Sequence, residues 1–153
     1  MIDPQRQSGE LSGSQQAQLA KIASNYKLTP ATMGHKLSQG AWIPAPWLLY
    51  ASREIAAEIA RGNGRLILSA PPRHGKSQLL SKYLPVWFLE HYPNKHVVIT
   101  AYGSELATDF SREARDLIKE NQDLVTVRLK TEREDNWLTT AGGSCRGIGL
   151  GGP

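Results

Sequence analysis

The stretch S-A-P-P-R-H-G-K-S, Ser69 to Ser77, decides how this chain is expected to fold. It follows the apolar run Leu66-Ile67-Leu68 and precedes a helix-like run that starts at Gln78. The part from Ala70 to Ser77 has the length of the pattern G-x-x-x-x-G-K-[ST], with Ala70 in place of the first glycine. A strand, such a loop and a helix in direct succession are typical of a site for phosphate groups.

The loop predicts six nucleotide-binding residues, which are Pro72, Arg73, His74, Gly75, Lys76 and Ser77. Gly75 lets the backbone approach an anion, Lys76 reaches the β- and γ-phosphates, and the Ser77 hydroxyl binds Mg²⁺. The expected cofactors are therefore ATP and Mg²⁺. A bare G-K-S also occurs in ordinary surface turns, and the flanking strand and helix favour the nucleotide site.

Arg73 and Lys76 are the candidate catalytic residues. An arginine inside the loop can offset the charge that develops during phosphoryl transfer, as an arginine finger does. Pairing of Arg73 with a carboxylate or with solvent explains this residue equally well. His74 is predicted to be a spacer in the loop, because no partner for a catalytic base is apparent beside it.

Composition indicates one globular unit of 153 residues with a formal net charge of +4, a modest excess that would help a nucleic-acid partner. Cys145 is the only cysteine, so an intrachain disulfide is excluded and a reducing compartment, the cytoplasm, is favoured. The apolar runs are shorter than the roughly 20 residues that span a bilayer, so no membrane association is expected.

Two regions are predicted. Residues 1–40 form a polar N-terminal arm with short helices, one over 17–25 and one that opens at Thr29-Pro30 and stops near Gly40. Residues 41–153 form an α/β unit that begins with an apolar connector, W-I-P-A-P-W, and a helix from Trp47 to the G-N-G sequence at 62–64.

The remaining elements predict a parallel sheet flanked by helices. A strand over 65–69, a helix over 76–91 kinked at Pro85, and a strand over 96–101 covered on both faces would form a right-handed β-α-β crossover. Ser104 is expected to cap the next helix, whose apolar stripe holds Leu106, Phe110, Leu117 and Ile118. A strand over 124–129, a charged loop over 130–136 and a hairpin of 137–140 with 144–150 follow.

The motif P-P-R-H-G-K-S at 71–77, followed by V-I-T-A-Y-G-S-E-L-A-T-D-F-S-R-E-A-R at 98–115, resembles the large terminase subunit of tailed bacteriophages and prophages. W-I-P-A-P-W-L-L-Y-A-S upstream and W-L-T-T-A-G-G-S-C-R-G-I-G-L-G-G-P downstream extend the similarity to residues 40–153. The resemblance implies a P-loop NTPase fold of the ASCE type and an ATP-driven motor that packages viral DNA into procapsids. It implies double-stranded DNA, a small terminase subunit and a portal protein as partners, in the cytoplasm of a bacterial host.

By the same resemblance, Lys76 and Ser77 contact phosphate and Mg²⁺, and Arg73 is the arginine of the loop. The region of Trp42, Pro46 and Trp47 corresponds to the part that helps hold adenine, although plain packing explains these tryptophans as well. The chain ends before the family's Walker B strand and holds no nuclease domain. The expectation is thus a fragment, incomplete at its C-terminus, that binds ATP and neither hydrolyses ATP nor cuts DNA unaided.

Two other functions stay open. V-I-T-A-Y-G-S-E-L-A also resembles a segment of helicases, so a helicase-type P-loop ATPase fragment is one alternative. The other is a non-enzymatic adaptor in which residues 1–60 bind a small terminase subunit. The other conspicuous residues, Cys145, His35, His91, His96 and the charged run 132–135, are predicted to be structural or solvated.

Overall fold

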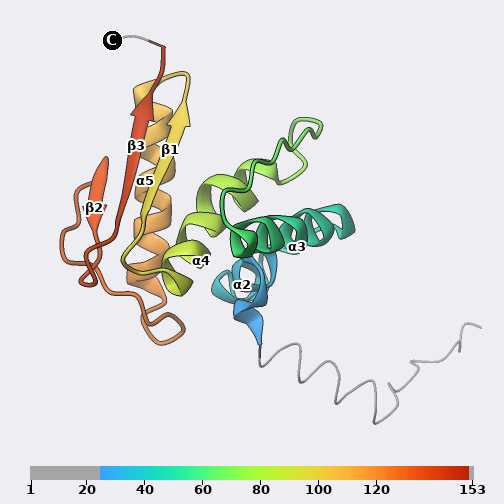
Figure 1. Ribbon diagram of the computed structural model, residues 1–153, viewed down its shortest axis with the longest axis horizontal. Helices are drawn as coiled ribbons and strands as arrows, with labels where there is room; N and C mark the ends of the chain where they lie inside the picture. Colours follow the sequence, from blue (N-terminus) through green and yellow to red (C-terminus); the bar gives the residue numbers. More distant parts are fainter. Residues whose placement is uncertain (1–24, 152–153) are drawn as a thin grey trace, which may run out of the picture.

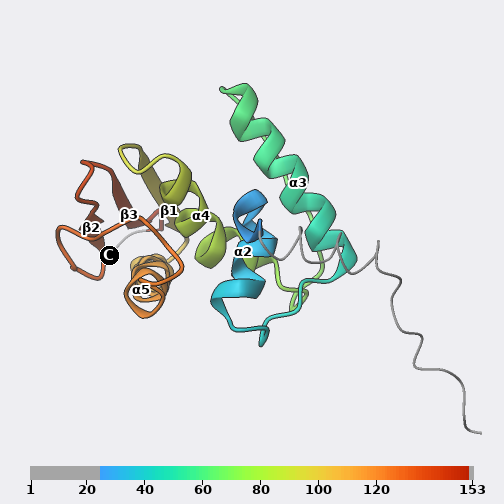
Figure 2. The same ribbon diagram turned by 90° about the horizontal axis from the view of Figure 1, so that it is seen from below.

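The computed structural model describes residues 25–151, which form a helical part and a small sheet backed by one long helix (Figure 1). The helical elements are η1 (Tyr26–Leu28), α2 (Pro30–Leu37), α3 (Pro46–Arg61), the π-helical η2 (Gln78–Tyr83), α4 (Leu84–His91) and α5 (Ser104–Glu120). The strands are β1 (His96–Ala101), β2 (Asn136–Leu138) and β3 (Ser144–Gly149). Figure 2 shows α4 between the sheet and the pair α2 and α3.

The three strands are ordered β1-β3-β2, with β1 parallel to β3 and β2 antiparallel to β3. The predicted hairpin of residues 137–140 with 144–150 is confirmed with slightly different bounds, since β2 and β3 pair antiparallel and Trp137 lies opposite Cys145. The strand predicted over 124–129 is wrong, because only Leu129 pairs, in an isolated bridge to Thr139. The charged loop predicted over 130–136 is confirmed up to Asn136, which begins β2.

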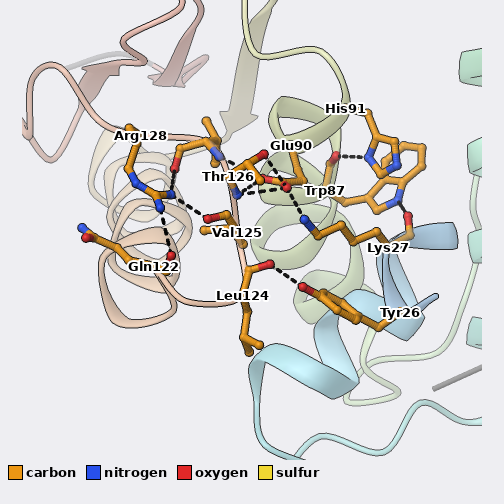
Figure 3. Close-up of polar contacts among 11 residues, drawn as sticks. Tyr26, Lys27, Trp87, Glu90, His91, Gln122, Leu124, Val125, Thr126 and Arg128 are labelled. Carbon is orange, nitrogen blue, oxygen red and sulfur yellow. Dashed lines mark hydrogen bonds and ion pairs between the residues drawn. The ribbon is translucent and has the colours of Figure 1, made fainter. Parts of the chain in front are cut away.

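A carboxylate takes the place of a neighbouring strand at Thr126 and Val127 (Figure 3). The side chain of Glu90 in α4 accepts hydrogen bonds from the backbone N–H of Thr126 at 2.9 Å and of Val127 at 3.0 Å. It also accepts from the Thr126 hydroxyl at 2.8 Å and pairs with Lys27 at 2.6 Å. These bonds satisfy two backbone N–H groups that a neighbouring strand would otherwise satisfy, and residues 125–128 have no regular secondary structure.

The strand predicted over 96–101 forms as β1, but the prediction that both faces are covered is wrong. Ile99 is buried, whereas Val98 is 57% exposed. Helix α5 lies against one face of the sheet (Figure 1), and β1 lies at the edge of the sheet. Val98, one position from Ile99, therefore points away from the covered face.

The strand predicted over 65–69 is also wrong. Residues 64–70 are irregular, and the Ile67 side chain is 98% exposed. A strand needs a partner for its backbone groups, and within residues 25–151 this segment pairs with none. The expected crossover from 65–69 to 96–101 is consequently not formed, and the parallel pair is instead β1 with β3, joined through α5.

Helix predictions nearer the N-terminus are confirmed. Thr29 caps α2 in a capping box with Thr32, and Pro30 occupies the first turn. Helix α3 begins at Pro46 and ends at Arg61, and the residue after it, Gly62, has a φ of 74° that suits a glycine. Residues 43–45 are non-helical, as the prolines of the connector predict. The helix predicted over 17–25 lies outside the described residues, apart from Asn25, which is in a turn.

The helix predicted over 76–91 is confirmed, and the irregularity expected at Pro85 takes the form of the π-helical turn η2 just before it. The N–H of Leu84 donates to the carbonyl of Leu79, five residues back. Because Pro85 carries no N–H, a change of hydrogen-bond register at this point is one way for the helix to continue past it. Pro85 itself is buried.

Helix α5 differs from its prediction at its start and along its buried face. Gly103 is the N-cap and no side chain caps the helix, so the predicted Ser104 cap is wrong. The stripe is also shifted, since Leu117 and Ile118 are buried as predicted but Leu106 is half exposed. A Cβ placed on Gly147 of β3 would lie 2.3 Å from the Ala107 carbonyl oxygen, so backbones meet here and small residues form the contact.

Two hydrophobic clusters hold the helices and the sheet together. The larger joins helices and sheet through Met33, Leu37, Tyr83, Val86, Trp87, Leu89, Ile99, Ala114, Leu117, Ile118, Val125, Val127, Trp137 and Cys145. The smaller joins α2, α3 and η2 through Ala31, Leu48, Ala51, Ile55 and Leu79. Residues of α2 thus contribute to both clusters, and Leu79 of η2 anchors the helix that follows the loop of residues 71–77.

Candidate phosphate-binding loop

The loop of residues 71–77 turns sharply before the helix begins. Arg73 and Gly75 both have left-handed backbones, with φ of 61° and 84°. The His74 ring nitrogen Nδ1 lies 2.7 Å from the carbonyl oxygen of Pro72, which braces the turn. The first helical hydrogen bond runs from the Leu79 N–H to the Gly75 carbonyl at 3.0 Å, so the helix starts directly after Gly75.

Six consecutive backbone N–H groups lie unused at this helix start. Within residues 25–151, no acceptor takes the N–H of any residue from 73 to 78. The first N–H groups of a helix have no partner inside the helix, and the helix dipole makes that end electropositive. Backbone donors in a turn that leads into a helix can hold an anion such as phosphate.

The loop side chains add positive charge and one hydroxyl to these amides. Among the described residues, Arg73 and Lys76 make no ion pair, and the Ser77 hydroxyl makes no hydrogen bond. Arg73 and Ser77 are exposed, whereas Lys76 is half-buried. The carboxylate partner considered for Arg73 is therefore not formed in the described part of the chain, and both cations remain free for a ligand.

Gly75 is restricted by packing as well as by its φ. A Cβ added there would lie 2.9 Å from Cδ1 of Leu48 and 3.9 Å from Nε1 of Trp42. The ring of Trp42 also stacks on Tyr83, with centroids 4.6 Å apart and planes inclined by 38°. Trp42 and the start of α3 thus form the wall behind the loop.

The three candidates for an adenine region are placed differently. Trp42 lies beside the loop, as its approach to Gly75 shows. Trp47 packs against the smaller cluster, and Pro46 is exposed in the first turn of α3. Within residues 25–151, Trp42 is thus the one of these three candidates that lies beside the loop of residues 71–77, where its Nε1 would be 3.9 Å from a Cβ on Gly75.

Other conspicuous residues have structural surroundings. Burial raises the pKa of Cys145 to about 12, and its side chain is fully inaccessible. Nδ1 of His35 and of His91 lies 2.9 Å from a backbone carbonyl, and Nδ1 of His96 lies 2.9 Å from the Ser144 hydroxyl. No group of three or more His, Cys, Asp or Glu side chains suited to a metal ion occurs within residues 25–151.

Two features of the loop were not anticipated from the sequence. The Gln78 N–H extends the row of free donors one residue beyond the motif, which the general pattern of helix starts could have indicated. The close approach of Leu48 to Gly75 leaves no room for a Cβ there, and it involves residues far apart in the chain, so no local sequence pattern indicates it.

Comparison of the chain with protein-family models, with curated proteins and with solved structures finds no match. None of the helices within residues 25–151 combines the length and the apolar character that crossing a membrane requires.

Proposed function

We propose that residues 72–78 bind the phosphate chain of ATP together with Mg²⁺. The observation that supports this most directly is a row of six N–H groups, from Arg73 to Gln78 at the start of a helix, that have no acceptor among residues 25–151. Lys76 would contact the β- and γ-phosphates, and the Ser77 hydroxyl would supply one ligand to the Mg²⁺ that accompanies the nucleotide. The remaining ligands of that ion would be phosphate oxygens and water.

The backbone N–H groups of residues 73–78 and the two cationic side chains of the loop are the type of hydrogen-bond donor that a phosphate group requires, and they are numerous enough to bind it. Phosphate oxygens accept several hydrogen bonds each, and bonds from charged donors are about twice as strong as neutral ones. Arg73 and Lys76 provide that charge without a competing carboxylate among the described residues. Glycine at 75 lets the loop keep this turn against its wall, because its φ is 84° and a Cβ there would lie 2.9 Å from Cδ1 of Leu48.

A titration of a fluorescent ATP analogue with Mg²⁺ tests the proposal. Because a hydrogen bond to a charged group contributes about 1.5–3 kcal/mol, Lys76→Ala should weaken binding by roughly 10- to 150-fold. Lys95→Ala is the matched control, since it removes the same charge from an exposed turn before β1 and should leave the affinity unchanged. Equal affinities for the Lys76→Ala variant and the unaltered chain would refute phosphate binding by the loop.

We further propose that this loop belongs to the ATPase domain of a large terminase subunit, with DNA, a small subunit and a portal protein as partners of the whole motor. This assignment depends on the motifs at 71–77 and 98–115. In a full-length motor, Arg73→Ala should lower turnover far more than nucleotide affinity, because a finger acts on the charge of the transition state. The DNA that follows the codon for Pro153 tests the family, since it should encode an acidic strand and a nuclease domain.

A further inference from the structure

The outer edge of β1 is an unprotected edge of the sheet. The strand H-V-V-I-T-A pairs with β3 on one side only, and no described strand lies on its other side. Edge strands usually carry Lys, Pro or a bulge that prevents association, whereas β1 contains no Lys, Arg, Asp, Glu or Pro. This edge offers an uncharged row of backbone donors and acceptors.

An apolar groove runs beside this edge. One cavity of about 440 Å³ lies between α4 and β1 and includes Val97 to Thr100 in its lining. A second, of about 470 Å³, includes Leu66 and Leu68. Both share Ile59, Leu80, Leu84 and Phe88, so these four side chains form a common floor with β1 on one side and residues 64–68 on the other.

The segment of residues 65–69, R-L-I-L-S, has the complementary character. Within the described part of the chain its backbone forms no hydrogen bond, and Leu66 and Ile67 are exposed. Apolar and β-branched residues of this kind favour strands once a partner edge is present. In one molecule the segment and β1 line different cavities, and Leu68 packs on the smaller cluster, which keeps the segment away from β1.

We propose that two copies of this chain associate by exchange, with residues 65–69 of each copy adding as a strand to the β1 edge and groove of the other. The contact is reciprocal, so a single pairing geometry is used twice and the assembly closes at two copies. Each copy contributes the five residues of its segment and the eleven residues that line its groove. This number of residues per side is slightly below the roughly 20–30 of a standard stable interface. The dimer is therefore reversible and dissociates on dilution.

Light scattering coupled to size-exclusion chromatography tests the exchange on the full chain. Twice the monomer mass is expected at about 100 µM, falling toward the monomer on dilution. Ile67→Lys places a charge in the segment that adds as a strand, and Val98→Lys places a charge in the β1 edge that receives it. Each variant should therefore be a monomer. Ile43→Lys is the control, because this side chain is 78% exposed in the connector before α3 and the variant should remain dimeric.

Mixing separates the exchange from other contacts. The Ile67→Lys copy keeps an intact β1 edge and the Val98→Lys copy keeps an intact segment, so a mixture should recover a weaker dimer that neither variant forms alone. A dimer that survives Ile67→Lys would indicate pairing of two β1 edges and would overturn the exchange. A monomer at every concentration of the unaltered chain would also overturn it, as would the absence of any recovery on mixing.

Discussion

Replacement of Glu90 by alanine should destabilise this protein more than most single substitutions. The Glu90 side chain is only 3% exposed, and its carboxylate accepts from two backbone N–H groups, the Thr126 hydroxyl and Lys27. Without it, Thr126 and Val127 lose their acceptors and the Lys27 charge loses its partner. Removing one member of a buried pair costs about 3–5 kcal/mol, a large part of the roughly 5–15 kcal/mol by which domains are stable.

Glu90→Gln isolates the contribution of the charge. The amide keeps one carbonyl oxygen as an acceptor but loses the ion pair with Lys27, which is 30% exposed and so partly compensated by water. The expected loss is about 1.5–3 kcal/mol, the value of a hydrogen bond to a charged group. Glu132→Gln is the matched control, because Glu132 also pairs with a lysine, at 2.7 Å, but is 56% exposed and should contribute less than about 1 kcal/mol.

The effect of Glu90 should depend on pH in a definite direction. Burial alone would raise the pKa of Glu90, but Lys27 and the donors of Val127 and Thr126 outweigh it and hold the pKa below its ordinary value. A carboxylate with a lowered pKa stabilises the fold fully above the unfolded-state value of about 4.3, and this contribution is lost as pH falls through the lowered pKa. The unaltered chain and Glu90→Gln should therefore converge in stability as pH falls.

Urea unfolding followed by circular dichroism at pH 7 and at pH 3 measures these differences. A Glu90→Ala loss below about 1 kcal/mol at pH 7 would refute the account, since a surface pair would explain it. A difference between the unaltered chain and Glu90→Gln that stays constant from pH 7 to pH 3 would refute the role of the charge.

Two further predictions follow from close packing and from burial. Gly147→Ala should lower the free energy of unfolding in urea by about 1–3 kcal/mol, because the new Cβ would meet backbone atoms of Ala107. Gly103→Ala is the control, since nothing lies within 4 Å of its Cβ position, and it should cost less than about 1 kcal/mol. Equal losses for the two variants would contradict the close contact at Gly147. Cys145 should react with a thiol reagent at pH 8 only after denaturation, since burial raises its pKa to about 12, and a full reaction of the folded chain within seconds would be inconsistent with that burial.

Sequence patterns located the helices well because their signals are local. Thr29 with Pro30 marks the start of α2, and Gly62 marks the end of α3, each through a preference of a single residue or a pair. The loop could be delimited in the same way, because the spacing of Gly75, Lys76 and Ser77 is itself the signal. Its function as a phosphate site stays a prediction.

Strands were harder to place because a strand depends on partners far along the chain. R-L-I-L-S at 65–69 and H-V-V-I-T-A at 96–101 are similarly apolar, yet only the second finds a partner, β3, among residues 25–151. The strand predicted over 124–129 is absent for a related reason, since a carboxylate from α4 accepts from the backbone N–H groups of Thr126 and Val127. No local pattern reports which of several apolar segments obtains the available edge.

The backbone contact between β3 and α5 also has a genetic consequence. Every glycine codon begins with GG, and no single nucleotide change there yields an amino acid without a Cβ. At Gly147 a Cβ would lie 2.3 Å from the Ala107 carbonyl oxygen. Each missense mutation at this codon therefore introduces a steric clash, whatever the chemical character of the new side chain. Descendants of this gene should vary freely at the third base of codon 147 while the first two bases stay fixed.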